Sequence, residues 1–321
     1  PGGSVNSSHV SPLRRKLSCM SLHPGNTPLV RLERLFDGAS VWAKLEGYNP
    51  SGSAKDRTAH AILEAADLQP GAVIVESSSG NLGVAMSREA VLGGWTFHCV
   101  VDPRANRSTV ATMRAYGAVV HEVTAPDPET GDWLAARRAR VAELLTELPD
   151  AVCLDQYSNR AAFTAHDEGT MREIVEQLGH APDHLLVAVS TTGTIGGCLR
   201  RIRREGLHTK VTAIDAEGSV LFDGARGTRH LPGFGAGVVP ELASSVHPDH
   251  VERITDRDSV AAARKLARTE GILCGASGGA VVAGVEKLLP ELNGDVVLIL
   301  HDGGTNYVDT IYNDDWVEET L

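Results

Sequence analysis

Short runs of consecutive apolar residues alternate along the chain with longer stretches whose apolar positions recur every three or four residues. The short runs predict buried strands at 40–46, 72–77, 96–102, 119–123, 184–190, 210–216 and 295–302. The longer stretches predict helices at 55–66, 81–92, 107–116, 133–147, 165–178, 196–205, 259–269 and 278–289. This alternation predicts an α/β fold with mainly parallel sheets that helices cover on both faces.

Three of the loops that follow predicted strands are rich in glycine, serine and threonine. They lie at 76–87, 189–202 and 271–284, and each runs into a predicted helix. Ligands of open parallel sheets bind beyond the carboxyl ends of the strands, so these loops are the expected place for chemistry. The third loop ends a strand-like piece at Ser277, with a helix predicted from Gly278, and on its own it is better explained by helix capping.

The first two loops have the composition of anion-binding sites. The segment from Ser78 to Asn81 offers hydroxyls and backbone N–H groups to a carboxylate at a helix start, beyond what one capping residue needs. The segment "STTGT" at 190–194 suits a phosphate, yet the lysine of a P-loop and the dinucleotide fingerprint are both missing. Nothing in these loops provides for Mg²⁺. A phosphate that is held and never transferred is therefore expected.

Lys55 stands among small residues at the start of a predicted helix, where the positive end of the helix dipole disfavours a cation. A surface charge is the simplest interpretation of such a lysine. With a metal-free phosphate site elsewhere, however, Lys55 fits a Schiff base to pyridoxal 5′-phosphate. A desolvated pocket would lower the pKa of its amine and favour its action as a base and nucleophile.

Composition limits the remaining possibilities. The 321 residues carry a net charge of −11, which argues against generic nucleic-acid binding but allows a local cationic pocket. The five cysteines form no C-x-x-C pair, so a reducing cytoplasm is expected, with Cys99, Cys153 and Cys198 as small buried residues. No apolar run is long enough for a membrane span, and the histidines show no metal-ligand spacing. Residues 1–12 are expected to form a flexible tail.

Five motifs together resemble the cysteine synthase and cystathionine β-synthase family of fold-type II pyridoxal-phosphate enzymes. They are "NPSGSAKDR", "SSSGNLG", "STTGT", "GFGAG" and "GASGGA", and the resemblance extends over about 21–316. It implies a tryptophan synthase β-like fold, with two doubly wound α/β domains and the cofactor between them. The larger domain would comprise 1–52 and 160–321, and the smaller, mobile domain 53–159. A homodimer is implied by the same analogy.

The resemblance also implies roles for individual residues. Lys55 corresponds to the Schiff-base lysine, Asn81 to the asparagine at the cofactor's ring hydroxyl, and Ser277 to the serine that faces the pyridine nitrogen. The phosphate would be held by Ser190, Thr191, Thr192, Gly193 and Thr194. The substrate carboxylate would be bound by Ser78, Ser79, Asn81, Leu82 and Gln156, while Tyr157 would line the pocket of the second substrate. The chemistry implied is β-replacement through an α-aminoacrylate.

One branch of the family is more similar than cysteine synthase itself. The segments "DAEGSVLFDG", "LPGFGAG" and "YVDTIYNDDWVE" resemble the N-(2-amino-2-carboxyethyl)-L-glutamate synthases of staphyloferrin B biosynthesis. This implies O-phospho-L-serine as first substrate, L-glutamate as nucleophile, and a precursor of L-2,3-diaminopropionate as product. A cysteine synthase acting on O-acetylserine or O-phosphoserine is the alternative.

The chain also departs from the family's patterns. Asn306 replaces the basic residue of the usual "D-x-G-x-R-Y". Arg107, Arg226 and Arg229 lie close in sequence to the active loops and are candidates for a substrate phosphate, although each fits a surface charge better. The segment "ARRAR" at 136–140 is expected to form the solvated face of a helix.

Overall fold

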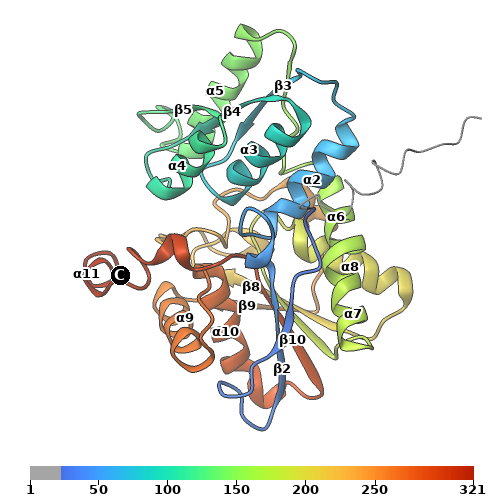
Figure 1. Cartoon of the computed structure of the whole chain (residues 1–321). Helices are drawn as coiled ribbons and strands as arrows, with labels where there is room; N and C mark the ends of the chain where they lie inside the picture. The colour runs from blue at the N-terminus through green and yellow to red at the C-terminus, as the bar shows by residue number, and fades with distance from the viewer. Residues whose placement is uncertain (1–22) are drawn as a thin grey trace, which may run out of the picture.

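The strands form two separate sheets in the computed structural model, which describes residues 23–321 (Figure 1). The larger sheet has the order β1 (Leu29–Arg31), β2 (Ser40–Leu45), β10 (Asp295–Leu300), β7 (His184–Ala188), β8 (Lys210–Ala216) and β9 (His250–Ile254). The smaller has the order β5 (Val119–Glu122), β4 (Thr96–Val101), β3 (Val73–Ser77) and β6 (Ala151–Val152). All pairings except β1 with β2 are parallel, which confirms the predicted α/β class.

Helices cover both faces of these sheets, as Figure 1 shows. The helices are α2 (Lys55–Ala66), α3 (Asn81–Gly93), α4 (Arg107–Ala115), α5 (Trp133–Glu147), α6 (Ala161–Ala165), α7 (Arg172–Leu178), α8 (Gly193–Glu205), α9 (Asp256–Glu270), α10 (Ala276–Leu288) and α11 (Asp314–Thr320). The π-helical segment η2 (His166–Met171) joins α6 to α7. Short 3₁₀ helices are η1 (Glu46–Tyr48), η3 (Leu221–Asp223), η4 (Glu241–Ser245), η5 (Leu289–Glu291) and η6 (Thr305–Tyr307).

The core explains why the strands read as continuous apolar runs. In β7, Leu186 packs in one hydrophobic cluster with α9 and α10, whereas its neighbours Leu185 and Val187 pack in another with α6 and α8. In β10, Leu298 and Val297 divide between the same two clusters. Since successive side chains of a strand point to opposite faces, a sheet covered on both faces needs apolar residues throughout.

The sequence pattern did not predict the elements that have few apolar residues. β1 and β6 are very short, β9 has the sequence "HVERI", and α11 is mostly acidic. Four predicted helix starts were wrong. The helix predicted from 165 begins with α6 at Ala161, and α9 begins at Asp256 instead of Ser259. α8 begins at Gly193 instead of Gly196, and α10 begins at Ala276, so Ser277 lies inside the first turn of a helix and not at a strand end. Glycine-rich helix starts have low helix propensity, and this shifts the apparent boundary toward the C-terminus.

Of the three cysteines that were expected to be buried, two are buried. Cys99 and Cys198 are buried as expected, but Cys153 is exposed, because β6 ends one residue earlier and the chain leaves the sheet. The division into domains at 52–53 and 159–160 stays a prediction, and the flexible tail at 1–12 lies outside the described residues. Within residues 23–321, no helix has both the length and the apolar content needed to cross a membrane.

Candidate active site

One cavity, of about 800 Å³, is lined by the loops that follow β3, β7 and β10. Elements of the smaller sheet contribute one part of its wall and elements of the larger sheet the other. It is therefore located where open parallel sheets bind ligands. All the residues predicted for the site line this cavity, namely Lys55, Ser78, Ser79, Asn81, Leu82, Gln156, Tyr157, Ser190, Thr191, Thr192, Gly193, Thr194 and Ser277.

Five helices begin at this cavity. Lys55, Asn81, Arg107 and Gly193 are the first residues of α2, α3, α4 and α8, and Ser277 is the second residue of α10. The first N–H groups of a helix have no acceptor within it, and the helix dipole makes this end positive. Their convergence provides donors and a positive potential for anionic groups such as phosphate or carboxylate.

Lys55 is held in the cavity without an acidic partner. Its Nζ lies 3.2 Å from Thr191 Oγ1. Within residues 23–321, no carboxylate oxygen lies within 4.0 Å of that amine. Burial lowers the pKa of Lys55 to about 8. The neutral amine, which is the form that acts as nucleophile or base, is therefore much more populated near neutral pH than in an ordinary lysine, although the protonated form still predominates.

The loop between β7 and α8 is strained and open on its inner side. Thr192 adopts the left-handed region (φ 65, ψ 6), which is rare for a β-branched residue. Its buried Oγ1 has no hydrogen-bond partner within the described part of the chain. A Cβ at Gly193 would lie 3.1 Å from the Cβ of Ala162. Strain and an unsatisfied hydroxyl at one turn are typical of a ligand-binding loop.

The loop between β3 and α3 keeps its shape through its own serines. Ser78 Oγ accepts from the N–H of Gly83 at 2.9 Å, which leaves the serine O–H able to donate to a ligand. Ser79 Oγ accepts from the N–H of Asp102 at 3.1 Å and from Arg137 Nη1 at 3.2 Å. The side chain of Leu82 packs in the core, so only its backbone can contact a ligand in the cavity.

Asp302, which was not among the predicted site residues, holds Asn81 across the cavity. Its Oδ2 accepts from Asn81 Nδ2 at 2.8 Å and from the hydroxyl of Tyr307 at 2.7 Å. Burial raises the pKa of Asp302, although both hydrogen bonds oppose this. A Cβ at Gly275 would lie 2.1 Å from Asp302 Oδ1, so that glycine leaves the space the carboxylate occupies. The motif "DGGTNY" was the signal for Asp302, but it does not reveal the partner of the carboxylate.

Replacement of Asp302 by asparagine should disturb Asn81 more than the fold. The variant loses a charged acceptor, and a hydrogen bond to a charged group is worth about 1.5–3 kcal/mol. We expect kcat/KM to fall by about 10- to 100-fold, with a shift in the visible absorption band of the bound cofactor. Tyr307→Phe is the matched control, because it removes the other donor to Asp302 and leaves Asn81 in contact. An equal spectral shift in both variants would contradict a specific link between Asp302 and Asn81.

Arg137 is a second residue that the sequence interpretation missed. The "ARRAR" segment was expected to be solvated, but Arg137 is only 9% exposed and lines the cavity. Its Nε lies 3.2 Å from Asp102 Oδ2. Helical periodicity places Arg137 on the inner face of α5 together with the buried Val141 and Leu144. That spacing was the available signal, and the density of charge around Arg137 obscured it.

The remaining candidate residues differ in their burial and in whether they line the cavity. Gln156 is buried, and the ring of Tyr157 is half-buried with the guanidinium of Arg138 stacked 5.0 Å from its centroid. Of the arginines considered for a substrate phosphate, Arg107 and Arg229 line the cavity. Arg226 is exposed outside it and donates to the carbonyl oxygen of Gly237.

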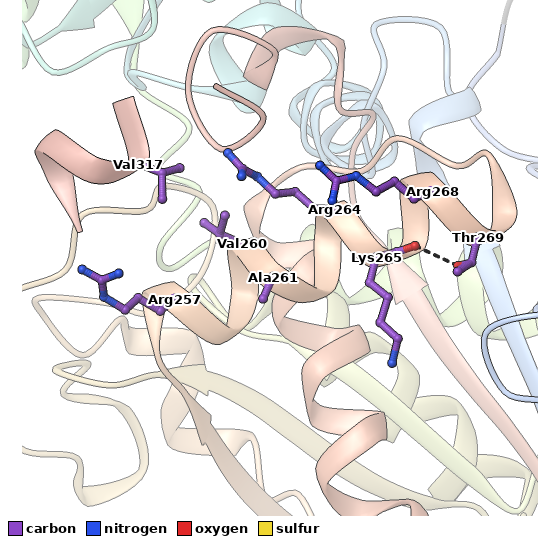
Figure 2. Close-up of a pocket in the computed structure, with 8 residues that line it drawn as sticks. All are labelled: Arg257, Val260, Ala261, Arg264, Lys265, Arg268, Thr269 and Val317. Carbon is purple, nitrogen blue, oxygen red and sulfur yellow. Dashed lines mark hydrogen bonds between the residues drawn. The ribbon is translucent and has the colours of Figure 1, made fainter. Parts of the chain in front are cut away.

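A second hollow lies over α9 (Figure 2). It measures about 470 Å³, and none of the predicted residues lines it. Its cations are partly neutralised, since Arg264 pairs with Asp314 and Lys265 lies 2.6 Å from Glu286. The hollow lacks the convergent helix starts of the first cavity.

Comparisons with known proteins agree with this geometry. A family model described as "Pyridoxal-phosphate dependent enzyme" matches residues 20–303. The chain is 42% identical to the N-(2-amino-2-carboxyethyl)-L-glutamate synthase of Ralstonia nicotianae and 41% identical to that of Cupriavidus metallidurans, in each case over 91% of this chain and 89% of the relative. The solved O-acetylserine dependent cystathionine beta-synthase of Helicobacter pylori superposes with a TM-score of 0.82 at 25% identity, over 91% of this chain and 97% of that one.

The chain therefore belongs to the pyridoxal-phosphate dependent enzyme family, and its cofactor is pyridoxal phosphate. It is an enzyme of the β-replacement type. The residues present fit the cofactor. The cavity offers a buried amine without an acidic partner for the aldehyde, and a strained Thr/Gly turn at a helix start for the phosphate.

Proposed function

We propose that the enzyme joins an activated L-serine, O-phospho-L-serine, to the amine of L-glutamate by β-replacement. The product would be N-(2-amino-2-carboxyethyl)-L-glutamate, a precursor of L-2,3-diaminopropionate for siderophore or antibiotic biosynthesis. The observation that carries this proposal is the identity of 41–42% with synthases of that name over nine-tenths of the chain. A cytoplasmic homodimer formed from two such chains is part of the same proposal.

In this proposal each part of the cavity has a task. When bound, pyridoxal phosphate supplies an electron sink that makes the substrate's α-proton acidic. Lys55 links to the cofactor and, as a neutral amine, takes that proton. Asn81 and Ser277 contact the cofactor ring, and Ser190, Thr191, Thr192, Gly193 and Thr194 hold its phosphate. Ser78, Ser79, Asn81, the backbone of Leu82 and Gln156 hold the substrate carboxylate, with Tyr157 beside the second substrate.

Arg137 is proposed to bind the phosphate of O-phosphoserine. It is a buried cation that donates to Ser79, and Ser79 belongs to the loop proposed for the carboxylate of the same substrate. Guanidinium groups bind phosphates through paired N–H donors.

The substitution Arg137→Gln should raise KM for O-phosphoserine by about 10- to 100-fold, since a hydrogen bond to a charged group contributes about 1.5–3 kcal/mol. Spectrophotometric titration with O-phosphoserine measures this, and O-acetylserine, which lacks the phosphate, serves as the comparison substrate. Arg140→Gln on the same helix is the control, because Arg140 pairs with the exposed Glu143 and Glu147. An equal loss with both substrates would argue against phosphate recognition by Arg137.

The function itself is tested by a product assay on the purified holoenzyme. O-phosphoserine or O-acetylserine would be mixed with L-glutamate or sulfide, and the products identified by liquid chromatography and mass spectrometry. We expect the glutamate adduct from O-phosphoserine. Cysteine as the main product would instead support the alternative, a cysteine synthase acting on O-acetylserine or O-phosphoserine.

A further inference from the structure

Arg229 lines the cavity but has no role in the contacts that are proposed for the first substrate. It belongs to the segment between η3 and η4 and is half-buried. A Cβ at Gly235 would lie 3.1 Å from Arg229 Nη1, and a Cβ at Gly237 would lie 3.3 Å from Nη2. Both glycines belong to "GFGAG", so this motif leaves space for the guanidinium and the segment fixes its position.

The guanidinium of Arg229 has unused hydrogen-bonding capacity. Its one hydrogen bond within residues 23–321 runs from Nη1 to the carbonyl oxygen of Phe234 at 3.5 Å, the limit of such a bond. No carboxylate of the described residues lies within 4.0 Å of it. Burial lowers the pKa of Arg229, the charges of Asp215 and Asp256 raise it, and Arg226 and Arg104 lower it further. A desolvated cation whose N–H donors are unused favours the binding of an anionic group.

None of the described carboxylates that line the cavity forms an ion pair with Arg229. The lining cations are Lys55, Arg104, Arg107, Arg137 and Arg229, and the lining carboxylates are Asp102, Asp302 and Asp309. Asp102 pairs with Arg104 and Arg137, and Asp302 accepts from Asn81 and Tyr307. Asp309 is exposed. The cavity thus holds an excess of positive charge in a chain whose net charge is −11, which favours anionic substrates.

We infer that Arg229 binds the side-chain carboxylate of the amino-acid nucleophile. This inference rests on the proposed β-replacement with L-glutamate. The carboxylate and the phosphate of the first substrate are assigned to the loop after β3 and to Arg137, both on the side of the smaller sheet. Arg229 follows β8 of the larger sheet and lines the same cavity. A bidentate pair between its guanidinium and a carboxylate would select a dicarboxylic amine over a neutral one.

The test separates the two half-reactions of the holoenzyme in wild type, Arg229→Gln, Arg229→Lys and Arg226→Gln. Arg226 lies on the same segment but outside the cavity, so Arg226→Gln is the control. We expect Arg229→Gln to raise KM for L-glutamate about 10- to 100-fold, while the spectral titration with O-phosphoserine stays within twofold of wild type. Arg229→Lys keeps the charge without the paired donors and should give an intermediate KM. L-glutamine, with its neutral side chain, should be used equally poorly by wild type and Arg229→Gln.

The outcomes distinguish this inference from the proposed function. A wild-type enzyme that forms no glutamate adduct overturns both. An adduct formed by Arg229→Gln with the wild-type KM for glutamate overturns the inference alone, as does a loss confined to O-phosphoserine binding. Should Arg229→Gln fail to fold in a thermal melt, Arg229→Lys decides the question, because an unchanged KM for glutamate in that variant contradicts bidentate recognition.

Discussion

The variant Lys55→Ala should lose turnover by at least about 10³-fold, because it removes the side chain proposed both to link the cofactor covalently and to take the α-proton. Among residues 23–321 the nearby His166 and His301 are poor substitutes, because burial, and then positive charge that includes Lys55, hold the pKa of each imidazole below the ordinary range for histidine and so make it a weak base. Borohydride reduction of the wild-type holoenzyme followed by peptide mass analysis should place the cofactor on Lys55. The variant should show no such adduct.

Lys265→Ala is the matched control for this substitution. Lys265 is exposed on α9 and pairs with Glu286, outside the cavity. Its loss should leave activity and the cofactor adduct unchanged. Turnover by Lys55→Ala within tenfold of wild type, or a reduced adduct on another lysine, would contradict the assignment of Lys55.

The fold could be predicted from sequence to the extent that burial dictates it. β8 and α5 were predicted to the residue, because Val211, Ala213 and Ile214 mark a short β-type run and Asp132 caps the start of α5. β9 could not be predicted in this way. Its "HVERI" alternates weakly, and it forms a strand because the edge of the larger sheet offers β8 as a partner. Such tertiary pairing is not encoded in a local window.

The candidate site was predicted best where loops carry special backbone requirements. Glycine, serine and threonine at helix starts are visible in the sequence, and those loops line one cavity. Asp302 and Arg137 were missed for a different reason. Each gains its meaning from a residue distant in the sequence, Asn81 for Asp302 and Ser79 for Arg137. In the sequence alone, a charged residue of a site cannot be told from a solvated surface charge. Only its neighbours in the folded chain distinguish a site residue from a surface residue.

A buried ion network involves the helix that begins with Lys55. Glu173 at the start of α7 contacts Lys44 Nζ at 2.8 Å and Arg57 Nη1 at 2.7 Å, and Arg57 Nε contacts Glu46 at 2.6 Å. All four side chains are at most 4% exposed. Arg57 lies on α2, the helix that begins with Lys55, so the network ties this helix to β2, η1 and α7.

Replacement of Glu173 by alanine should lower the free energy of unfolding by about 3–5 kcal/mol, because it leaves Lys44 and Arg57 buried without their shared partner. Burial raises the pKa of Glu173, but hydrogen bonds and charge from Arg57 and Lys44 outweigh it and lower that pKa to about 2. The stabilisation is therefore complete above the unfolded value of 4.5 and is lost as the pH falls toward 2. Urea unfolding of wild type and variant at pH 7 and pH 4 measures both effects.

Glu176→Ala on the same helix is the control for Glu173. Glu176 pairs with Arg172 at the surface, where such a pair contributes about 0.3–0.5 kcal/mol. The difference in the free energy of unfolding between wild type and Glu173→Ala should become smaller as the pH falls below 4.5. The corresponding difference for Glu176→Ala should stay small at every pH. A loss of less than 1 kcal/mol in Glu173→Ala would mean that water or a backbone shift satisfies Lys44 and Arg57. The network would then not be what holds α2, and with it Lys55, against the larger sheet.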